Sequence, residues 1–93
     1  MSAAESADDY PVVAILNPRW RVIECGAGIQ WILQHRASAG THATARWVGR
    51  KYCRTKEALI RSCRLLTGEI EPAACTILAA LPERIAERQA VLA

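Results

Sequence analysis

The chain has 93 residues and a formal net charge of +3, and 52% of its residues are apolar although it contains no Phe. This length supports one small domain with one hydrophobic core. No stretch approaches the roughly 20 apolar residues that a membrane-spanning helix needs. The first ten residues carry three acids and no basic residue, unlike a secretory signal, so we expect a cytoplasmic protein with no membrane partner.

The charges divide the chain into a basic middle and two acidic ends. Residues 19–64 contain ten Lys/Arg and two Asp/Glu, whereas the rest of the chain contains two Lys/Arg and seven Asp/Glu. This asymmetry indicates an anionic partner for the middle: nucleic acid, or an acidic or RNA-bearing protein complex.

The chain is predicted to consist of an N-terminal tail followed by one domain. Residues 1–10 are small, polar and acidic, and we expect them to be disordered. Residues 11–93 then form a single small α+β domain. Its first apolar run, Pro11 to Leu16, fits either an edge strand or a segment packed over the core.

Three strands are predicted over residues 20–25, 29–36 and 45–53. The first two are joined by the tight glycine loop 26–28, which predicts a hairpin. Alternation in the second strand places Trp31 and Leu33 on one face and the polar residues on the other.

The third strand contains a glycine that permits an irregularity. A regular register turns Trp47 toward the core and Arg46, Val48 and Arg50 outward. Gly49 allows a β-bulge, which would bring Tyr52 back to the core face.

Helices are predicted after the strands. Thr55 is a good N-cap for a helix over residues 56–67, whose apolar stripe buries Leu59, Cys63 and Leu66. Pro72 begins a second helix and Pro82 a third. The predicted fold is therefore α+β, a three-stranded antiparallel sheet with two to three helices packed on one face.

The sequence offers no catalytic or metal-binding constellation. The acids cluster near the termini, and His35 and His42 match no ligand spacing with the four cysteines, which include no C-x-x-C pair. We expect free, mostly buried thiols, no cofactor, no metal and no enzymatic activity.

The open face of the sheet is the predicted binding surface. A sheet covered by helices on one side leaves its other side exposed. Arginine binds phosphates and carboxylates, and arginine and glutamine read base edges. The expected binding residues on that face and its rim are Gln30, Gln34, Arg36, Arg46, Arg50, Lys51, Arg54, Arg61 and Arg64. The alternative is a solvated basic surface with no partner.

Two sequence patterns carry a resemblance to known DNA-binding domains. They are Gly28-x-x-Trp31 and Trp47-x-Gly49-x-x-Tyr52-x-x-Thr55-x-Glu57-Ala58, together spanning about 40 of the 93 residues. With three strands before a Thr-capped helix, the chain resembles the DNA-binding domains of plant ethylene-response factors and the arm-binding domains of tyrosine integrases. The resemblance implies a sheet laid in the major groove, with contacts from Arg46, Trp47 and Arg50; those families lack a helix after the Pro72 position.

The Ala/Arg-rich composition is also similar to that of small phage and mobile-element proteins. One class of these is the anti-CRISPR inhibitors, which bind a CRISPR effector complex and block it. The sequence therefore favours a non-catalytic nucleic-acid-binding module first, a protein-binding inhibitor second and an enzyme last. A homodimer remains an open alternative.

Overall fold

The computed structural model describes residues 5–37 and 46–85. The elements within these ranges are β1 (Ala14–Asn17), β2 (Trp20–Glu24), β3 (Trp31–Ala37), β4 (Arg46–Cys53), α2 (Lys56–Leu66) and α3 (Pro72–Ala79). The α+β class is confirmed. The sheet has four strands rather than three, because the apolar run after Pro11 supplies β1. The helix predicted to begin at Pro82 does not begin there: residues 82–84 are not helical, because Arg84 instead forms an antiparallel bridge with Thr55. The rest of that predicted helix, from residue 86, lies outside the described residues.

The four strands form an antiparallel meander in the order β1-β2-β3-β4. Trp31 pairs with Cys53 at one end of the β3–β4 ladder, and Ala37 pairs with Arg46 at the other. Between them the register shifts, so that Leu33 pairs with Lys51 but Gln34 pairs with Gly49. This is the bulge that the glycine predicted.

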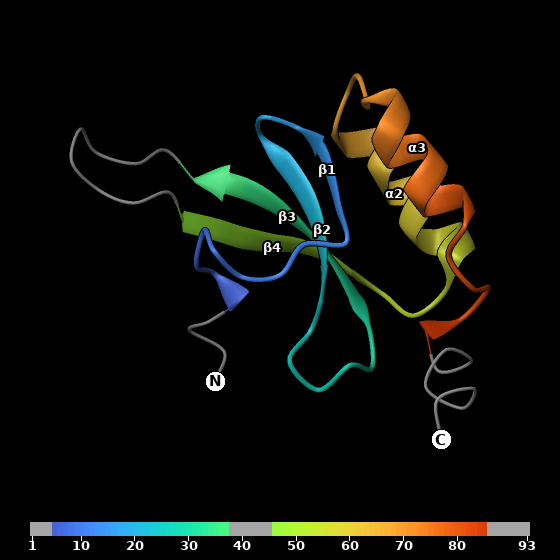
Figure 1. The fold of residues 1–93 in the computed structure, drawn as a ribbon, viewed down its shortest axis with the longest axis horizontal. Coiled ribbons are helices and arrows are strands. Elements are labelled where there is room, and N and C mark those ends of the chain that lie inside the picture. The colour runs from blue at the N-terminus through green and yellow to red at the C-terminus, as the bar shows by residue number, and fades with distance from the viewer. Residues whose placement is uncertain (1–4, 38–45, 86–93) are drawn as a thin grey trace.

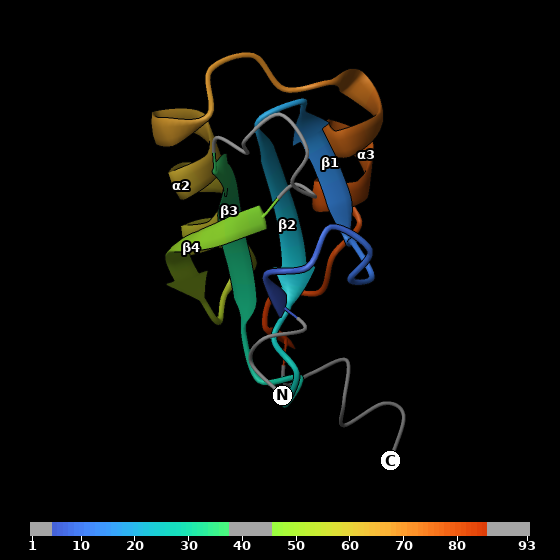
Figure 2. The same cartoon turned by 90° about the vertical axis from the view of Figure 1, so that its left-hand side faces the viewer.

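Both helices pack on one face of the sheet, α2 over β3 and β4 and α3 along β1 (Figures 1 and 2). The core between the layers includes Trp31 and Leu33 from the sheet and Leu59 and Cys63 from α2, all fully buried. Their burial agrees with the predicted stripe. None of the helices in the described ranges is long and apolar enough to cross a membrane.

The last turn of α2 differs from the prediction. Leu66 is 38% exposed, whereas Thr67 is buried. The Thr67 hydroxyl donates a 2.7 Å hydrogen bond to the Cys63 carbonyl, and the Thr67 N–H donates to the same oxygen. The helix closes on this threonine, and Leu66 points away from the core.

The ends of the two helices are fixed by side chains. The Thr55 hydroxyl accepts a hydrogen bond from the Ala58 N–H at 3.2 Å, which confirms the predicted N-cap. The Lys56 ammonium donates to the carbonyl of Ala79, the last residue of α3, and to that of Leu81 just after the helix. A cation there suits the negative end of a helix dipole.

Part of the other face of the sheet is covered by residues 5–10, which we call the N-terminal strap (Figure 2). Ala7 forms an antiparallel bridge with Arg46, and the Trp47 N–H donates to the Ser6 carbonyl at 3.0 Å. Tyr10 packs against the small apolar cluster of Ile23, Cys25 and Ile32. The expectation of a disordered tail therefore differs from the structure over residues 5–10, because strand edges and buried donors on the sheet supply partners for this segment. Residues 1–4 lie outside the described part.

Candidate binding surface

Most of the predicted binding residues lie on the surface along β4 and α2. Seven cations are exposed, and we call them together the basic surface: Arg36, Arg46, Arg50, Lys51, Arg54, Arg61 and Arg64. Within residues 5–37 and 46–85, none of the seven forms an ion pair with a carboxylate. Exposed cations without acidic partners attract a polyanion.

The strand register divides this surface between the two faces of the sheet. Arg46 and Val48 pair with Ala37 and His35, on the same face as Leu33 and the helices. Trp47 pairs with Arg36 and points to the opposite face, under the strap. The predicted orientation of β4 is thus reversed at this end.

The reversal has a physical reason in the partners of Trp47. Its indole N–H donates to a carboxylate oxygen of Asp8 at 2.9 Å, and its ring lies under the Arg21 guanidinium. Both of these partners lie on the strap side of the sheet, which explains why Trp47 turns that way. The bulge does bring Tyr52 onto the face of Trp47, but this is not the helix face, and Tyr52 is 59% exposed. The prediction that the bulge returns Tyr52 to the core is therefore wrong.

The two predicted glutamines are not part of an open surface. Gln34 is only 3% exposed, and its amide donates to the Glu5 carbonyl at 2.8 Å. Gln30 is half-buried in the loop before β3, where its carbonyl accepts the Cys25 N–H. The prediction placed both on a bare sheet, and the strap covers the part that contains Gln34.

Arg21 is the residue that sequence reasoning overlooked. It is 2% exposed, and its guanidinium donates to the Gln34 side chain at 2.7 Å and to the carbonyls of Glu5, Ala7 and Asp8 at 3.2, 2.8 and 3.2 Å. Burial lowers the pKa of Arg21 below its usual value, and the nearby charge of Asp8 partly opposes this. The alternation of β2 contained the signal, since it places Arg21 opposite Gln34 on the face away from Val22.

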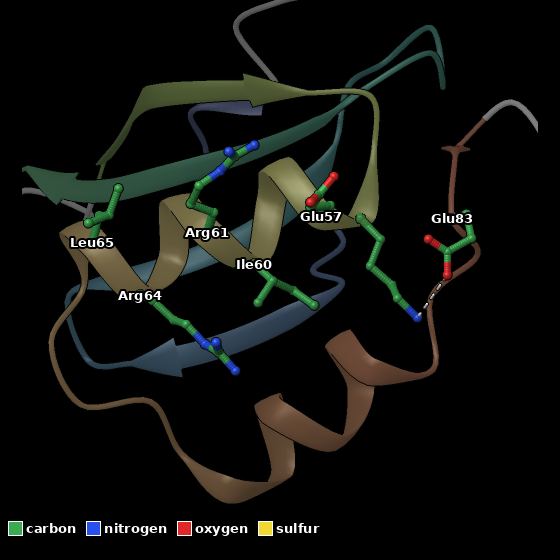
Figure 3. Close-up of a pocket in the computed structure, with 7 residues that line it drawn as sticks. Glu57, Ile60, Arg61, Arg64, Leu65 and Glu83 are labelled. Atoms are coloured by element: carbon green, nitrogen blue, oxygen red, sulfur yellow. Dashed lines mark ion pairs between the residues drawn. The ribbon is translucent and has the colours of Figure 1, made fainter.

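A shallow groove of about 530 Å³ runs along the outer side of α2 (Figure 3). Its lining residues are Lys56, Glu57, Ile60, Arg61, Arg64, Leu65 and Glu83. Arg61 points toward β4, whereas Arg64 points away from it toward α3. Arg61 therefore extends the β4 cations, and Arg64 lies on the far side of the groove.

One ion pair closes the end of this groove. The Lys56 ammonium lies 3.8 Å from a carboxylate oxygen of Glu83, whose side chain is 76% exposed. A pair this open to solvent contributes little stability. It leaves Arg61 and Arg64 as the groove's cations without an ion-pair partner among the described residues.

The thiols and acids form no reactive cluster in the described ranges. Cys25, Cys53 and Cys63 are buried and free, and Cys75 is exposed and free. Burial, and then the neighbouring thiols of Cys53 and Cys75, raise the pKa of Cys63 to about 12. Its thiolate population at neutral pH is therefore negligible.

Metal ligands are likewise dispersed in the part of the chain that the structure covers, where no three His, Cys, Asp or Glu side chains could hold one ion. His42 lies outside that part.

Comparisons of the chain with protein-family models, with curated proteins and with solved structures found no match.

Proposed function

We propose that this chain is a non-catalytic module that binds nucleic acid through the cations of β4 and α2. The observation that carries the proposal is the basic surface itself: exposed cations on adjoining elements, none of them paired with a carboxylate among the described residues. Binding would rest on Arg46, Arg50 and Lys51 from β4, with Arg54 and Arg61 beside them and Arg36 and Arg64 at the periphery.

The chemistry of these residues suits a phosphodiester backbone. Contacts from arginine and lysine to phosphate oxygens release condensed counterions, and this release supplies most of sequence-independent affinity. The guanidinium group also binds a phosphate through two parallel hydrogen bonds. Such phosphate contacts would position the protein on the nucleic-acid backbone and would give no preference for particular bases.

A protein-binding inhibitor, such as an anti-CRISPR protein that blocks an effector complex, is the second candidate. It is favoured by exposed apolar residues among the cations: Leu65 at 76%, Tyr52 at 59% and Val48 at 50%. Arginine together with tyrosine and apolar side chains is typical of protein–protein interfaces. This candidate uses the same elements with an acidic or RNA-bearing partner.

The experiment compares two variants with the same loss of charge. Arg46→Gln with Arg50→Gln neutralises β4, whereas Ala73→Glu with Thr76→Glu adds two acids to exposed positions of α3, which packs at β1, at the opposite edge of the sheet. We expect the β4 pair to weaken binding to a labelled duplex at least about tenfold, from the loss of roughly two phosphate contacts, and the α3 pair to change it far less.

Three outcomes separate the candidates. Equal losses in the two variants would mean that only net charge matters, and the proposed surface would be wrong. No binding of DNA or RNA at low salt by the parent protein would reject the nucleic-acid proposal. Capture of one protein complex that is lost in the β4 pair would then support the inhibitor.

A further inference from the structure

Where described residues of the strap and of the sheet face beneath it form hydrogen bonds with each other, nearly all of these bonds run in one direction. The donors are the side chains of Arg21, Gln34 and Trp47 and the backbone N–H of Trp47 in the sheet, together with the backbone N–H of Gly26 in the β2–β3 loop. The strap accepts with the carbonyls of residues 5–8 and the carboxylates of Glu5 and Asp8. The reverse bond, from the Tyr10 hydroxyl to the Glu24 carbonyl at 2.9 Å, lies at the end of the strap.

This sheet face also carries rings and a free cation. Trp47 lies on it under the strap, and Tyr52 shares the face at 59% exposure. Arg36, the cross-strand partner of Trp47, is exposed on the same face. Hydrogen-bond donors beside aromatic rings and an arginine are the elements with which proteins bind single-stranded nucleic acid.

The strap is held by polar contacts more than by apolar burial. Ala7 and Tyr10 are half-buried, whereas Asp8 and Asp9 are exposed. A hydrogen bond that is exchanged for an equivalent one changes the free energy little, because the donor keeps an acceptor throughout. Another chain that offers acceptor oxygens can therefore take the place of the strap at modest cost.

We propose that this face is a binding site for single-stranded nucleic acid, which the acidic strap occupies in the free protein. Phosphate oxygens would accept from Arg21, Gln34 and Trp47 where strap oxygens now accept, and bases would stack on Trp47 and Tyr52. The strap is one chain wide, so the ligand that replaces it is a single strand rather than a duplex. The inference deepens the proposed function, because the strap also bridges to Arg46 of the basic surface.

A matched pair of strap variants tests the proposal. Asp8→Ala removes the acceptor of the Trp47 indole, whereas Asp9→Ala removes the same charge from an exposed neighbour for which the structure gives no hydrogen bond. We expect Asp8→Ala to raise affinity for a labelled short oligothymidylate severalfold more than Asp9→Ala does. Equal increases in affinity would mean that only charge repulsion acts. They would overturn the proposal that the strap occupies a binding site, which we call the masked site.

Removal of residues 2–9 should raise the affinity for oligothymidylate more than either point variant does. This variant keeps Tyr10 on its apolar cluster, and circular dichroism checks its fold. If the strap covers the site nine-tenths of the time or more, its loss tightens oligothymidylate binding at least about tenfold, because the apparent affinity is reduced by the fraction of open protein. The affinity for a duplex of equal length should change much less. An unchanged or weaker affinity for the single strand would contradict the proposal.

The intact protein supplies a readout that does not depend on the deletion. On saturation with oligothymidylate, hydrogen exchange should accelerate in the strap, including the Tyr10 amide that bonds to the Ala7 carbonyl at 3.2 Å. The Arg36 amide, which bonds to the Arg19 carbonyl at 2.8 Å and has no partner in the strap, should stay protected. A strap that keeps its protection at saturation would reject the proposal, as would a peptide of residues 2–9 that binds the truncated protein more tightly than oligothymidylate does.

The same series distinguishes this inference from the proposed function. If neutralising Arg46 and Arg50 weakens binding but loss of the strap does not strengthen it, the basic surface stands and the masked site fails. If both changes act, both stand. If no nucleic acid binds either form of the protein, both fail.

Discussion

The Arg21 guanidinium lies 4.4 Å from the centroid of the Trp47 ring, where β2, β4 and the N-terminal strap meet. The cation is buried and the ring is almost so, at 2% and 8% exposure. A buried guanidinium is tolerated only where its donors have acceptors, and here Gln34 and three strap carbonyls supply them. The buried arginine therefore links the sheet to the strap, because the strap carbonyls are the acceptors of its guanidinium.

Replacement of Arg21 by lysine should destabilise the protein although the charge is kept. Lysine cannot reach the same four acceptors with a planar fork, and part of the network would lose its donors. We expect a loss of about 2–3 kcal/mol in the free energy of unfolding, measured by urea denaturation. Arg19→Lys is the control, because Arg19 is exposed two residues earlier. A loss no larger than in the control would show that the network contributes little.

Replacement of two leucines of α2 should have very different effects on stability. Leu59 is fully buried against the sheet, and its replacement by alanine should cost about 2–5 kcal/mol. Leu65 is 76% exposed on the same helix, and the same replacement should change stability by less than about 0.5 kcal/mol. Thermal or urea unfolding gives both values. Similar losses at the two positions would mean that α2 packs with a different face.

The bulge in β4 predicts a coupling between Gly49 and Tyr52. A Cβ atom added at Gly49 would collide with the Tyr52 ring and its hydroxyl and lie 3.2 Å from a methyl carbon of Ile32. Because the tyrosine side chain is exposed, it can swing away, and we expect Gly49→Ala to cost only about 1 kcal/mol. In a Tyr52→Ala background the cost should fall. A cost that is the same in both backgrounds would contradict the observed packing.

Local patterns in the sequence were sufficient for much of the fold. The alternation predicted over residues 29–36, the Thr55 cap and the glycine bulge each depend on neighbours a few residues away. The structure contains all three, although the strand begins at Trp31 and Ile29 before it is 46% exposed. Strand β1 cannot be assigned from the sequence alone, because a short apolar run such as Pro11 to Leu16 fits equally well a strand or a segment that covers the core.

The surface could not be predicted as well, because it depends on a contact distant in sequence. Residues 5–10 meet Arg21, Gln34 and Trp47, which come from three different strands. The acidic composition of residues 5–10 by itself indicates disorder. The segment takes a defined position because donors on the sheet bind its oxygens. The same contact reversed the predicted orientation of Trp47 and removed Gln34 from the open surface.

The four cysteines should differ sharply in reactivity. Cys75 is the one exposed thiol, whereas the pKa of Cys63 is raised to about 12, so at pH 8 Cys63 has almost no thiolate. We expect iodoacetamide to modify one thiol quickly in the native protein and the others only after denaturation. Mass spectrometry follows the reaction, and Cys75→Ser should abolish the fast phase. A fast phase that survives this change would show that a thiol described as buried is accessible.

The salt dependence of binding tests how many cations of the basic surface meet phosphates. With about five phosphate contacts, the logarithm of the affinity for duplex DNA should fall against the logarithm of salt with a slope of about −4 to −5. Neutralising Arg46 and Arg50 should make that slope shallower by about 2, since each contact contributes about 0.9. Ala73→Glu with Thr76→Glu removes no contact, and its slope should match that of the parent. A shallow slope in the parent, with tight binding to one protein complex, would instead favour the inhibitor, because specific protein contacts release few counterions. A parent slope that is steep but unaffected by the change at Arg46 and Arg50 would place the phosphate contacts elsewhere on the chain.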